Sequence, residues 1–306
     1  MKLIDSQEKP ALASILMILG LFVIGFMVLG SLIQMLVMLL FGLGLEEIVS
    51  GSSNPKAWWA MIVGQGLGSL LGFVGTAWFY WKIIEKKEWK DLNFSNNLSL
   101  PIFGVVVLIQ ITSMGFNGWL QDINQSIVFP EALKSLEAAL KAMEDKLNET
   151  TEFFTNFTSF GQFLLAFLVI AVIAGIGEEL IFRGLLLRKI YLGTNNIHLA
   201  VWISAFVFAL IHFQFYGILP RMMLGVLFGY FYVWTGNIRV PIFAHIFNNG
   251  LAVVVMYLHN LKIIKADLET LDDIPSSMIV FSCIATIGLL FLLKNYVLTQ
   301  QIQSDN

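Results

Sequence analysis

Residues 11–45 read ALASILMILGLFVIGFMVLGSLIQMLVMLLFGLGL and contain no Asp, Glu, Lys or Arg. An α-helix crosses a bilayer core with roughly 20 consecutive apolar residues, so this stretch alone predicts a membrane span. Seven further windows of the 306-residue chain carry no charge, and they are 57–81, 92–121, 153–177, 190–220, 222–238, 240–261 and 274–293. The pattern excludes a soluble domain, which needs interleaved polar residues, and a transmembrane β-barrel, whose strands alternate. A hydrophobic content of 57% also excludes a disordered chain.

We therefore predict an all-α polytopic integral membrane protein of about eight transmembrane helices, forming a single membrane domain over residues 1–306. The expected spans are about 13–42, 57–81, 100–120, 158–182, 197–214, 217–235, 240–258 and 276–294. Two connections are rich in basic residues: Lys82, Lys86, Lys87 and Lys90 follow the second span, and Arg183, Arg188 and Lys189 follow the fourth. Basic residues gather on the cytoplasmic side, so both termini are expected there. The bare eight-span build suits a bacterial inner (cell) membrane.

The loop at 121–157 is expected to lie outside the membrane. Within it, 130–147 repeats leucine or methionine at steps of three and four residues, which predicts an amphipathic helix that caps the bundle or acts as a lid. The net charge of −3 and the lack of a basic patch leave the lipid bilayer, and no nucleic acid, as the expected partner surface.

Ionisable and amide side chains inside the predicted spans fall at three places. The fourth span ends in Gly-Ile-Gly-Glu-Glu-Leu-Ile-Phe-Arg with Glu178, Glu179 and Arg183, the fifth carries Phe-Ala-Leu-Ile-His212, and the seventh begins with His245-Ile-Phe-Asn-Asn249. Such groups are costly in a bilayer, so each is a functional candidate. Glu179 and Arg183 are four residues apart and share a helix face, which predicts a structural ion pair. Glu178 is turned about 100° away from that pair.

One carboxylate, two histidines and an amide suit hydrolysis. Glu178, helped by His212, would deprotonate a water, while His245 and Asn249 would donate hydrogen bonds to the oxyanion of a tetrahedral intermediate. Glu178, His212 and His245 could equally hold one catalytic divalent metal, Zn²⁺, with an open coordination position. No two histidines lie four residues apart, so the usual His-Glu-x-x-His zinc motif is absent.

Glu-Glu-x-x-x-Arg, Phe-x-x-x-His and His-x-x-x-Asn, in this order on successive apolar segments, resemble the CPBP family. This family comprises the CAAX prenyl proteases and bacteriocin-processing proteins, also called the Abi family. The resemblance places a catalytic core at 158–258 and implies an intramembrane endopeptidase that cuts a prenylated (CAAX-type) protein or a membrane-associated peptide. By that analogy Glu178 and His212 activate the water, and His245 and Asn249 form the oxyanion site. The family is named as metalloproteases, and a glutamate-dependent mechanism is the competing view.

Two readings of other classes stay open on the residues alone. A membrane transporter or proton relay would also use Glu178, His212 and His245. A catalytically silent bacteriocin-immunity protein would keep the fold without the chemistry.

Overall fold

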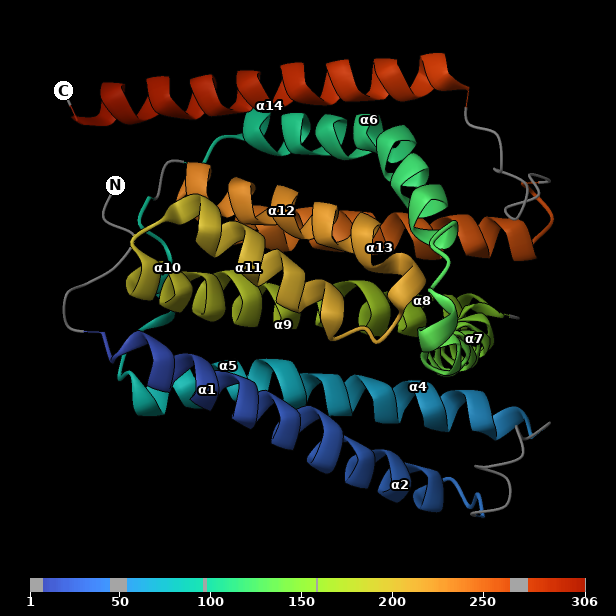
Figure 1. The fold of residues 1–306 in the computed structure, drawn as a ribbon. Coiled ribbons are helices and arrows are strands. Elements are labelled where there is room, and N and C mark those ends of the chain that lie inside the picture. The colour runs from blue at the N-terminus through green and yellow to red at the C-terminus, as the bar shows by residue number, and fades with distance from the viewer. Residues whose placement is uncertain (1–7, 45–53, 96–97, 158, 265–274, 306) are drawn as a thin grey trace. The chain divides into compact units, whose positions relative to one another are not determined.

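The computed structural model describes residues 8–44, 54–95, 98–157, 159–264 and 275–305, and within these ranges it contains helices and turns but no strand (Figure 1). This confirms the predicted all-α fold. The chain divides into two compact units. The first unit comprises 1–92, 151–195 and 245–265, and the second comprises 93–150, 196–244 and 266–306. The single membrane domain predicted over 1–306 stays a prediction.

Among the described residues, seven helices are long and apolar enough to cross a membrane, which confirms the polytopic fold. They are Ala11–Leu40, Pro55–Ile84, Leu100–Gln125, Phe160–Thr194, Phe215–Thr235, Arg239–Asn260 and Ser276–Gln300. The remaining predicted span, 197–214, corresponds to α11 (Ile197–Leu210), which is apolar but has only 14 residues. A helix of that length rises about 21 Å, short of the roughly 30 Å of a bilayer core.

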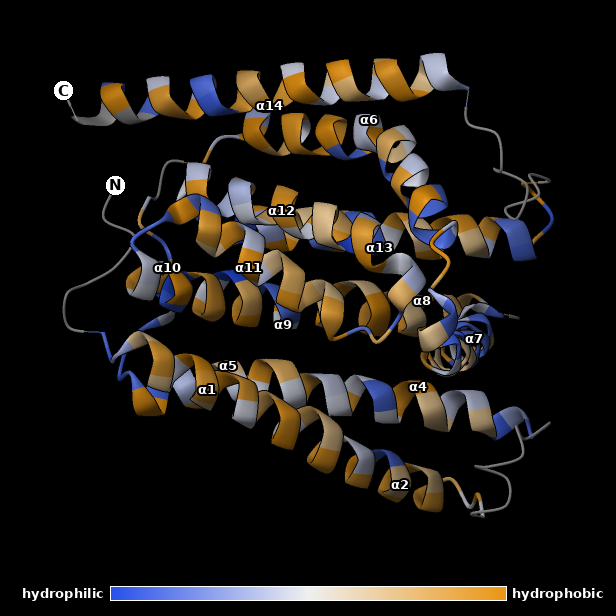
Figure 2. Ribbon diagram, in the orientation of Figure 1, coloured by the Kyte–Doolittle hydropathy of each residue, from blue (hydrophilic) through white to orange (hydrophobic). Residues whose placement is uncertain are grey.

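The outward faces of several helices are apolar and exposed. Figure 2 shows α1, α2 and α14 coloured mostly as hydrophobic along their length. Leu12, Leu40 and Phe281 on these helices are 71%, 77% and 69% exposed. Large apolar surface of this kind marks contact with another apolar phase, which for a membrane protein is lipid.

The first unit contains the first, second and fourth spans and the C-terminal part of α13. Its helical elements are α1 (Ala11–Phe22), η1 (Val23–Leu29), α2 (Gly30–Leu40), α4 (Pro55–Ser69), η2 (Leu70–Gly75), α5 (Thr76–Trp78), η3 (Phe79–Ile84), η4 (Trp89–Leu92), α8 (Phe160–Ala166), η6 (Phe167–Ile173), α9 (Ala174–Glu179), η7 (Leu180–Leu187), α10 (Arg188–Thr194) and residues 245–260 of α13 (Arg239–Asn260). Within it, α2 packs along α4, and α1 packs against α10.

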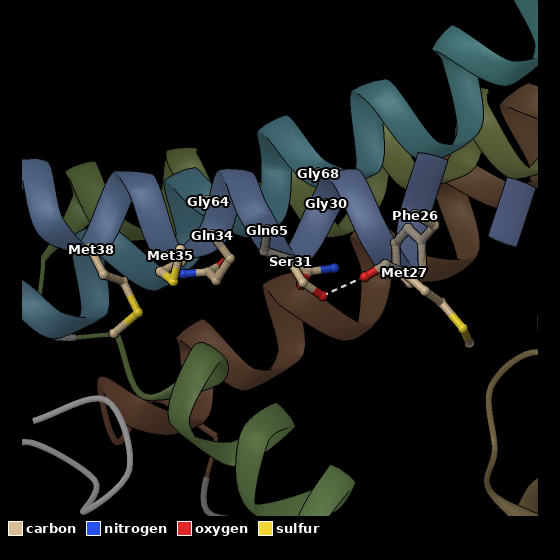
Figure 3. Close-up of a pocket in the computed structure, with 10 residues that line it drawn as sticks. All are labelled: Phe26, Met27, Gly30, Ser31, Gln34, Met35, Met38, Gly64, Gln65 and Gly68. Carbon is tan, nitrogen blue, oxygen red and sulfur yellow. Dashed lines mark hydrogen bonds between the residues drawn. The ribbon is translucent and has the colours of Figure 1, made fainter. Parts of the chain in front are cut away.

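Glycines let α2 and α4 approach closely. A Cβ on Gly68 would lie 3.3 Å from the Cα of Gly30, so both positions have to be small for the backbones to meet there. A groove of about 480 Å³ lies beside this contact (Figure 3). Methionine and glutamine side chains, including Met35, Gln34 and Gln65, form part of its wall. The groove contains none of the predicted site residues.

The fourth span is longer than the predicted 158–182. Its helix runs from Phe160 to Thr194, so Arg183, Arg188 and Lys189 lie within this helix and not in a connection that follows it, and that expectation is wrong. Their position on the cytoplasmic side stays a prediction. Arg183 and Lys189 are fully buried, and Arg188 is 4% exposed. The helix passes through these residues because carboxylates inside the first unit neutralise them. A left-handed Asn195 (φ 51°) then ends the helix.

A buried ion network joins three ends of spans in the first unit. Lys189 Nζ lies 3.0 Å from Glu8 Oε2 and 2.6 Å from Glu85 Oε1, and Arg188 donates to Glu8 Oε1 at 2.7 Å. Tyr80 donates to Glu85 at 2.7 Å. Burial alone would raise the pKa of Glu85, but the hydrogen bonds from Lys189 and Tyr80 and the Lys189 charge lower it below its ordinary value. The start of the first span, the end of the second and the end of the fourth therefore meet.

The second unit contains the other spans and the loop helix. Its elements are α6 (Leu100–Gln125), η5 (Glu131–Leu133), most of α7 (Lys134–Thr155), α11 (Ile197–Leu210), η8 (Phe215–Gly217), α12 (Ile218–Thr235), the first turns of α13, and α14 (Ser276–Asp305). α6 packs on α14 and α12, and these helices share an apolar core. Gly225 and Gly229 let α12 approach α11, because a Cβ at either position would lie 2.9 Å from an α11 side chain.

The amphipathic helix predicted at 130–147 forms within η5 and α7. Leu133, Leu136 and Met143 on its apolar stripe are 45–47% exposed. The position of the 121–157 loop outside the membrane stays a prediction.

Candidate active site

Glu179 links Arg183 to His245. One of its oxygens, Oε1, accepts from Arg183 NH1 at 2.5 Å and lies 2.8 Å from His245 Nδ1. A carboxylate only accepts, so Nδ1 carries the proton in this bond and the chemistry of the ring is left to Nε2. Glu179 and Arg183 thus form the predicted ion pair, and Glu179 also orients His245. The i,i+4 spacing predicts the ion pair but carries no signal for the bond to a helix 66 residues further along.

Glu178 faces the other side of the same imidazole. Its Oε2 lies 3.7 Å from His245 Nε2, which is within ion-pair distance but beyond hydrogen-bond length. Glu178 is 7% exposed and His245 4% exposed. Adjacent glutamates therefore meet the two nitrogens of one ring, Glu179 at Nδ1 and Glu178 at Nε2.

Helix α13 runs antiparallel to α8–α9 in the first unit. His245 meets Glu179, Asn249 meets Ile170, and Tyr257 stacks on Phe163 with ring centroids 4.4 Å apart. Rising numbers on one helix thus pair with falling numbers on the other. This register fixes the height at which the His245 side chain lies along α9.

The two glycines before Glu178 permit this packing. A Cβ on Gly175 would lie 2.9 Å from Cγ1 and 3.1 Å from the backbone nitrogen of Ile246, next to His245. A Cβ on Gly177 would lie 2.5 Å from the Cβ of Phe73 on η2. Gly-Ile-Gly-Glu-Glu is therefore a packing motif as well as a chemical one, because its glycines bring two neighbouring helices against the glutamate turn.

Asn249 is tied to the fourth span. Its Nδ2 donates to the carbonyl of Ile170 at 3.1 Å, and its Oδ1 accepts from Asn248 at 3.3 Å. These bonds fix the orientation of the amide one turn beyond His245. The sequence suggests Asn249 as an oxyanion donor but does not reveal the Ile170 carbonyl that holds it.

His212 belongs to the second unit, in the turn that follows α11. Its Nδ1 lies 2.8 Å from the carbonyl oxygen of Phe208, and since a carbonyl only accepts, Nδ1 donates. A neutral ring in this state has its lone pair on Nε2. The Phe-x-x-x-His motif therefore joins two residues one helix turn apart. The Phe208 carbonyl accepts the hydrogen bond from His212, and the Phe208 ring packs edge-on against the imidazole, with ring centroids 5.1 Å apart.

The predicted metal ligands are divided between the two units. Glu178 and His245 supply two donors in the first unit, and the third predicted ligand, His212, belongs to the second. Among the residues that the structure describes, no group of three or more His, Cys, Asp or Glu side chains is arranged to hold a metal ion. The metal site stays a prediction.

Comparison with known proteins points to one family. Residues 160–251 match the family model described as Rce1-like, Type II CAAX prenyl endopeptidase Rce1-like. The membrane-embedded CAAX protease MroQ of Staphylococcus aureus (strain USA300) is 31% identical over 102 residues, which are 32% of this chain and 41% of that protein. YdiL of Bacillus subtilis (strain 168), named provisionally as a membrane peptidase, is 33% identical over 91 residues, 30% of this chain and 37% of that protein.

The chain thus spans about two fifths of the length of these curated relatives. No solved structure matches it. The family match contains all three motifs and lies inside the predicted core 158–258, so the resemblance drawn from the motifs is confirmed.

Proposed function

We propose that this chain, which carries a CPBP-family protease segment at residues 160–251, is an intramembrane endopeptidase that hydrolyses a peptide bond with a glutamate-activated water. The family match supports a membrane endopeptidase. The observation that carries the proposed chemistry is the His245 ring between Glu179 at Nδ1 (2.8 Å) and Glu178 at Nε2 (3.7 Å).

In the proposed mechanism a water is hydrogen-bonded to the Glu178 carboxylate. The Glu178 carboxylate takes a proton from this water as its oxygen bonds to the scissile carbonyl carbon, and the carbonyl electron pair moves onto the oxygen. Protonated His245, stabilised by Glu179 in the way that a triad aspartate stabilises its histidine, donates through Nε2 to this oxyanion, and Asn249 donates beside it. When the intermediate collapses, the C–N bond breaks and the proton held by Glu178 passes to the leaving amine.

His212 is proposed to assist Glu178 at the water. The resemblance to the family motifs supports this role, because Phe-x-x-x-His212 lies inside the family match at 160–251.

The substrate is proposed to be a membrane-associated peptide or the prenylated C-terminus of a protein. The name of MroQ, a CAAX protease, motivates the second class. The test is cleavage by the purified protein in lipid nanodiscs, using one peptide with and without a prenyl group and reading the products by mass. We expect wild type to cut and Glu178→Gln to lose at least a hundredfold in rate, with the exposed Glu149→Gln on α7 as the matched control. Equal cutting by wild type and Glu178→Gln contradicts the proposal.

Direct action on water also predicts behaviour toward chelators. Cleavage should survive 1,10-phenanthroline and dialysis against EDTA. One zinc per chain, lost together with activity and restored with it, would instead establish the metal that the motif also allows.

The proposed location is a bacterial inner membrane with both termini in the cytoplasm. The matched relatives are bacterial. The contacts of Lys189 with Glu8 and Glu85 bring the start of the first span beside the ends of the second and fourth spans. These three ends lie on the same side of the membrane if successive spans cross it in alternating directions. The lysine-rich segment after the second span, 82–90, favours the cytoplasm for that side.

A further inference from the structure

The loop that carries His212 has a backbone that its own sequence does not favour. Phe213, the next residue, has φ +54°, in the left-handed region that a phenylalanine rarely adopts. Such a conformation persists where surrounding contacts impose it. These contacts come from α6 and α7, outside the 160–251 family match.

Helix α7 holds the loop through one face. Glu144 Oε2 accepts from the backbone N–H of Tyr216 at 2.8 Å, and Asn148 Oδ1 accepts from the Gln214 side chain at 2.8 Å. Glu144 and Asn148 are one helix turn apart. Gln214 in turn accepts from Arg221 at 2.5 Å through its other amide atom. The segment two to four residues after His212 is therefore bonded to α7.

The end of α6 holds the same loop from a second element. Asn124 is 1% exposed, and its amide uses both ends. Nδ2 donates to the carbonyl of Phe215 at 2.9 Å, and Oδ1 accepts from the N–H of Leu219 at 2.7 Å. The Asn124 side chain thus bonds both the first residue of the short η8 helix and the start of α12. This one buried amide fixes the backbone at the end of the loop that carries His212.

We infer that α7 and Asn124 position His212, with Glu144 and Asn124 as positioning residues that act through the 211–217 loop. The inference rests on the proposed function, in which His212 assists Glu178. Neither residue acts on the reacting atoms. A role in orientation should therefore appear in turnover rather than in substrate binding.

The first measurement is amide hydrogen exchange of peptides covering 211–221, on the full chain in nanodiscs. Glu144→Ala should speed exchange at Tyr216 by about tenfold or more, because its N–H loses a charged acceptor. Glu144→Gln keeps an acceptor oxygen and should restore slow exchange. Glu149→Ala removes an exposed carboxylate from the same helix and should change nothing. Unchanged exchange in Glu144→Ala overturns the inference.

The second measurement is peptide cleavage by the same variants. Glu144→Ala should lower kcat about tenfold with KM within twofold, and Glu144→Gln should recover most of kcat. Faster exchange with an unchanged kcat overturns the positioning role. A fall in kcat that Glu144→Gln does not recover also counts against it. If wild type itself cuts nothing, the proposed function fails, while the exchange measurement still decides whether α7 holds the loop.

Discussion

Removing the guanidinium of Arg183 should separate stability from activity. Its side chain is 1% exposed, that of Glu179 is 0% exposed, and the two are 2.5 Å apart. Taking one partner from a buried pair costs about 3–5 kcal/mol, because the other charge stays desolvated. Arg183→Met should therefore destabilise the protein by that amount. In the double variant Glu179→Met/Arg183→Met neither charge is buried, so the loss should be at least about 2 kcal/mol smaller than the sum of the two single losses.

The assay is denaturant unfolding in mixed micelles, followed by tryptophan fluorescence, beside peptide cleavage in nanodiscs. Activity should also be lost in the double variant, although its loss of stability is smaller than the sum of the single losses, because His245 Nδ1 has lost the carboxylate that orients it. Lys141→Met on the exposed face of α7 is the control for the loss of a charge. An Arg183→Met variant within about 1 kcal/mol of wild type, or a double variant that cuts normally, would refute the reasoning.

Three further experiments have expected outcomes. Gly175→Ala should cost about 1–3 kcal/mol and lower kcat, since its Cβ meets α13 beside His245, whereas Gly184→Ala, whose Cβ would be at 3.5 Å from its nearest neighbour, should be close to neutral in the same unfolding assay. The pKa of Glu85 is lowered in the folded protein, so its contribution to stability is present above its ordinary pKa of 4.5 and is lost as the pH falls through the folded pKa. Glu85→Gln should therefore flatten the acid limb of the stability–pH curve, and an acid limb parallel to that of wild type would contradict this. With the native cysteine replaced, Lys87→Cys should react with an impermeant maleimide only in broken cells and Glu149→Cys in intact ones, and the reverse pattern would invert the topology.

The apolar windows predict the class of fold because charge-free length is itself the physical requirement of a bilayer. The same rule misplaces the end of the fourth span. Arg183, Arg188 and Lys189 read as a basic connection, yet the helix continues to Thr194. The partners that neutralise Arg188 and Lys189 are Glu8 and Glu85, which are remote in sequence, and no local pattern indicates them. The position of a basic residue in the sequence therefore does not show whether a distant carboxylate will neutralise it in the fold.

The site divides in a similar way. Glu178, Glu179 and His245 are predicted as candidates, and the structure brings them together. The spacing of Glu179 and Arg183 accounts for their pair, but the role of Glu179 toward His245 depends on the register of two helices. Gly175 permits that register, because a Cβ at this position would lie 2.9 Å from Ile246 Cγ1, and the sequence alone does not indicate this contact. Sequence therefore identifies the chemical groups, and packing decides which nitrogen each group meets.

The ion network of the first unit has a consequence for how the protein is made. Glu8 and Glu85 are synthesised well before Arg188 and Lys189, the cations they neutralise. Until the fourth span enters the membrane, both carboxylates have to stay hydrated at its surface, since burying an unpaired charge is prohibitively costly. The first hairpin therefore cannot settle into its final packing on its own. Insertion of the helix that carries Glu178 completes the packing of the first two spans, so a chain truncated ahead of residue 188 should be a substrate for quality-control proteolysis.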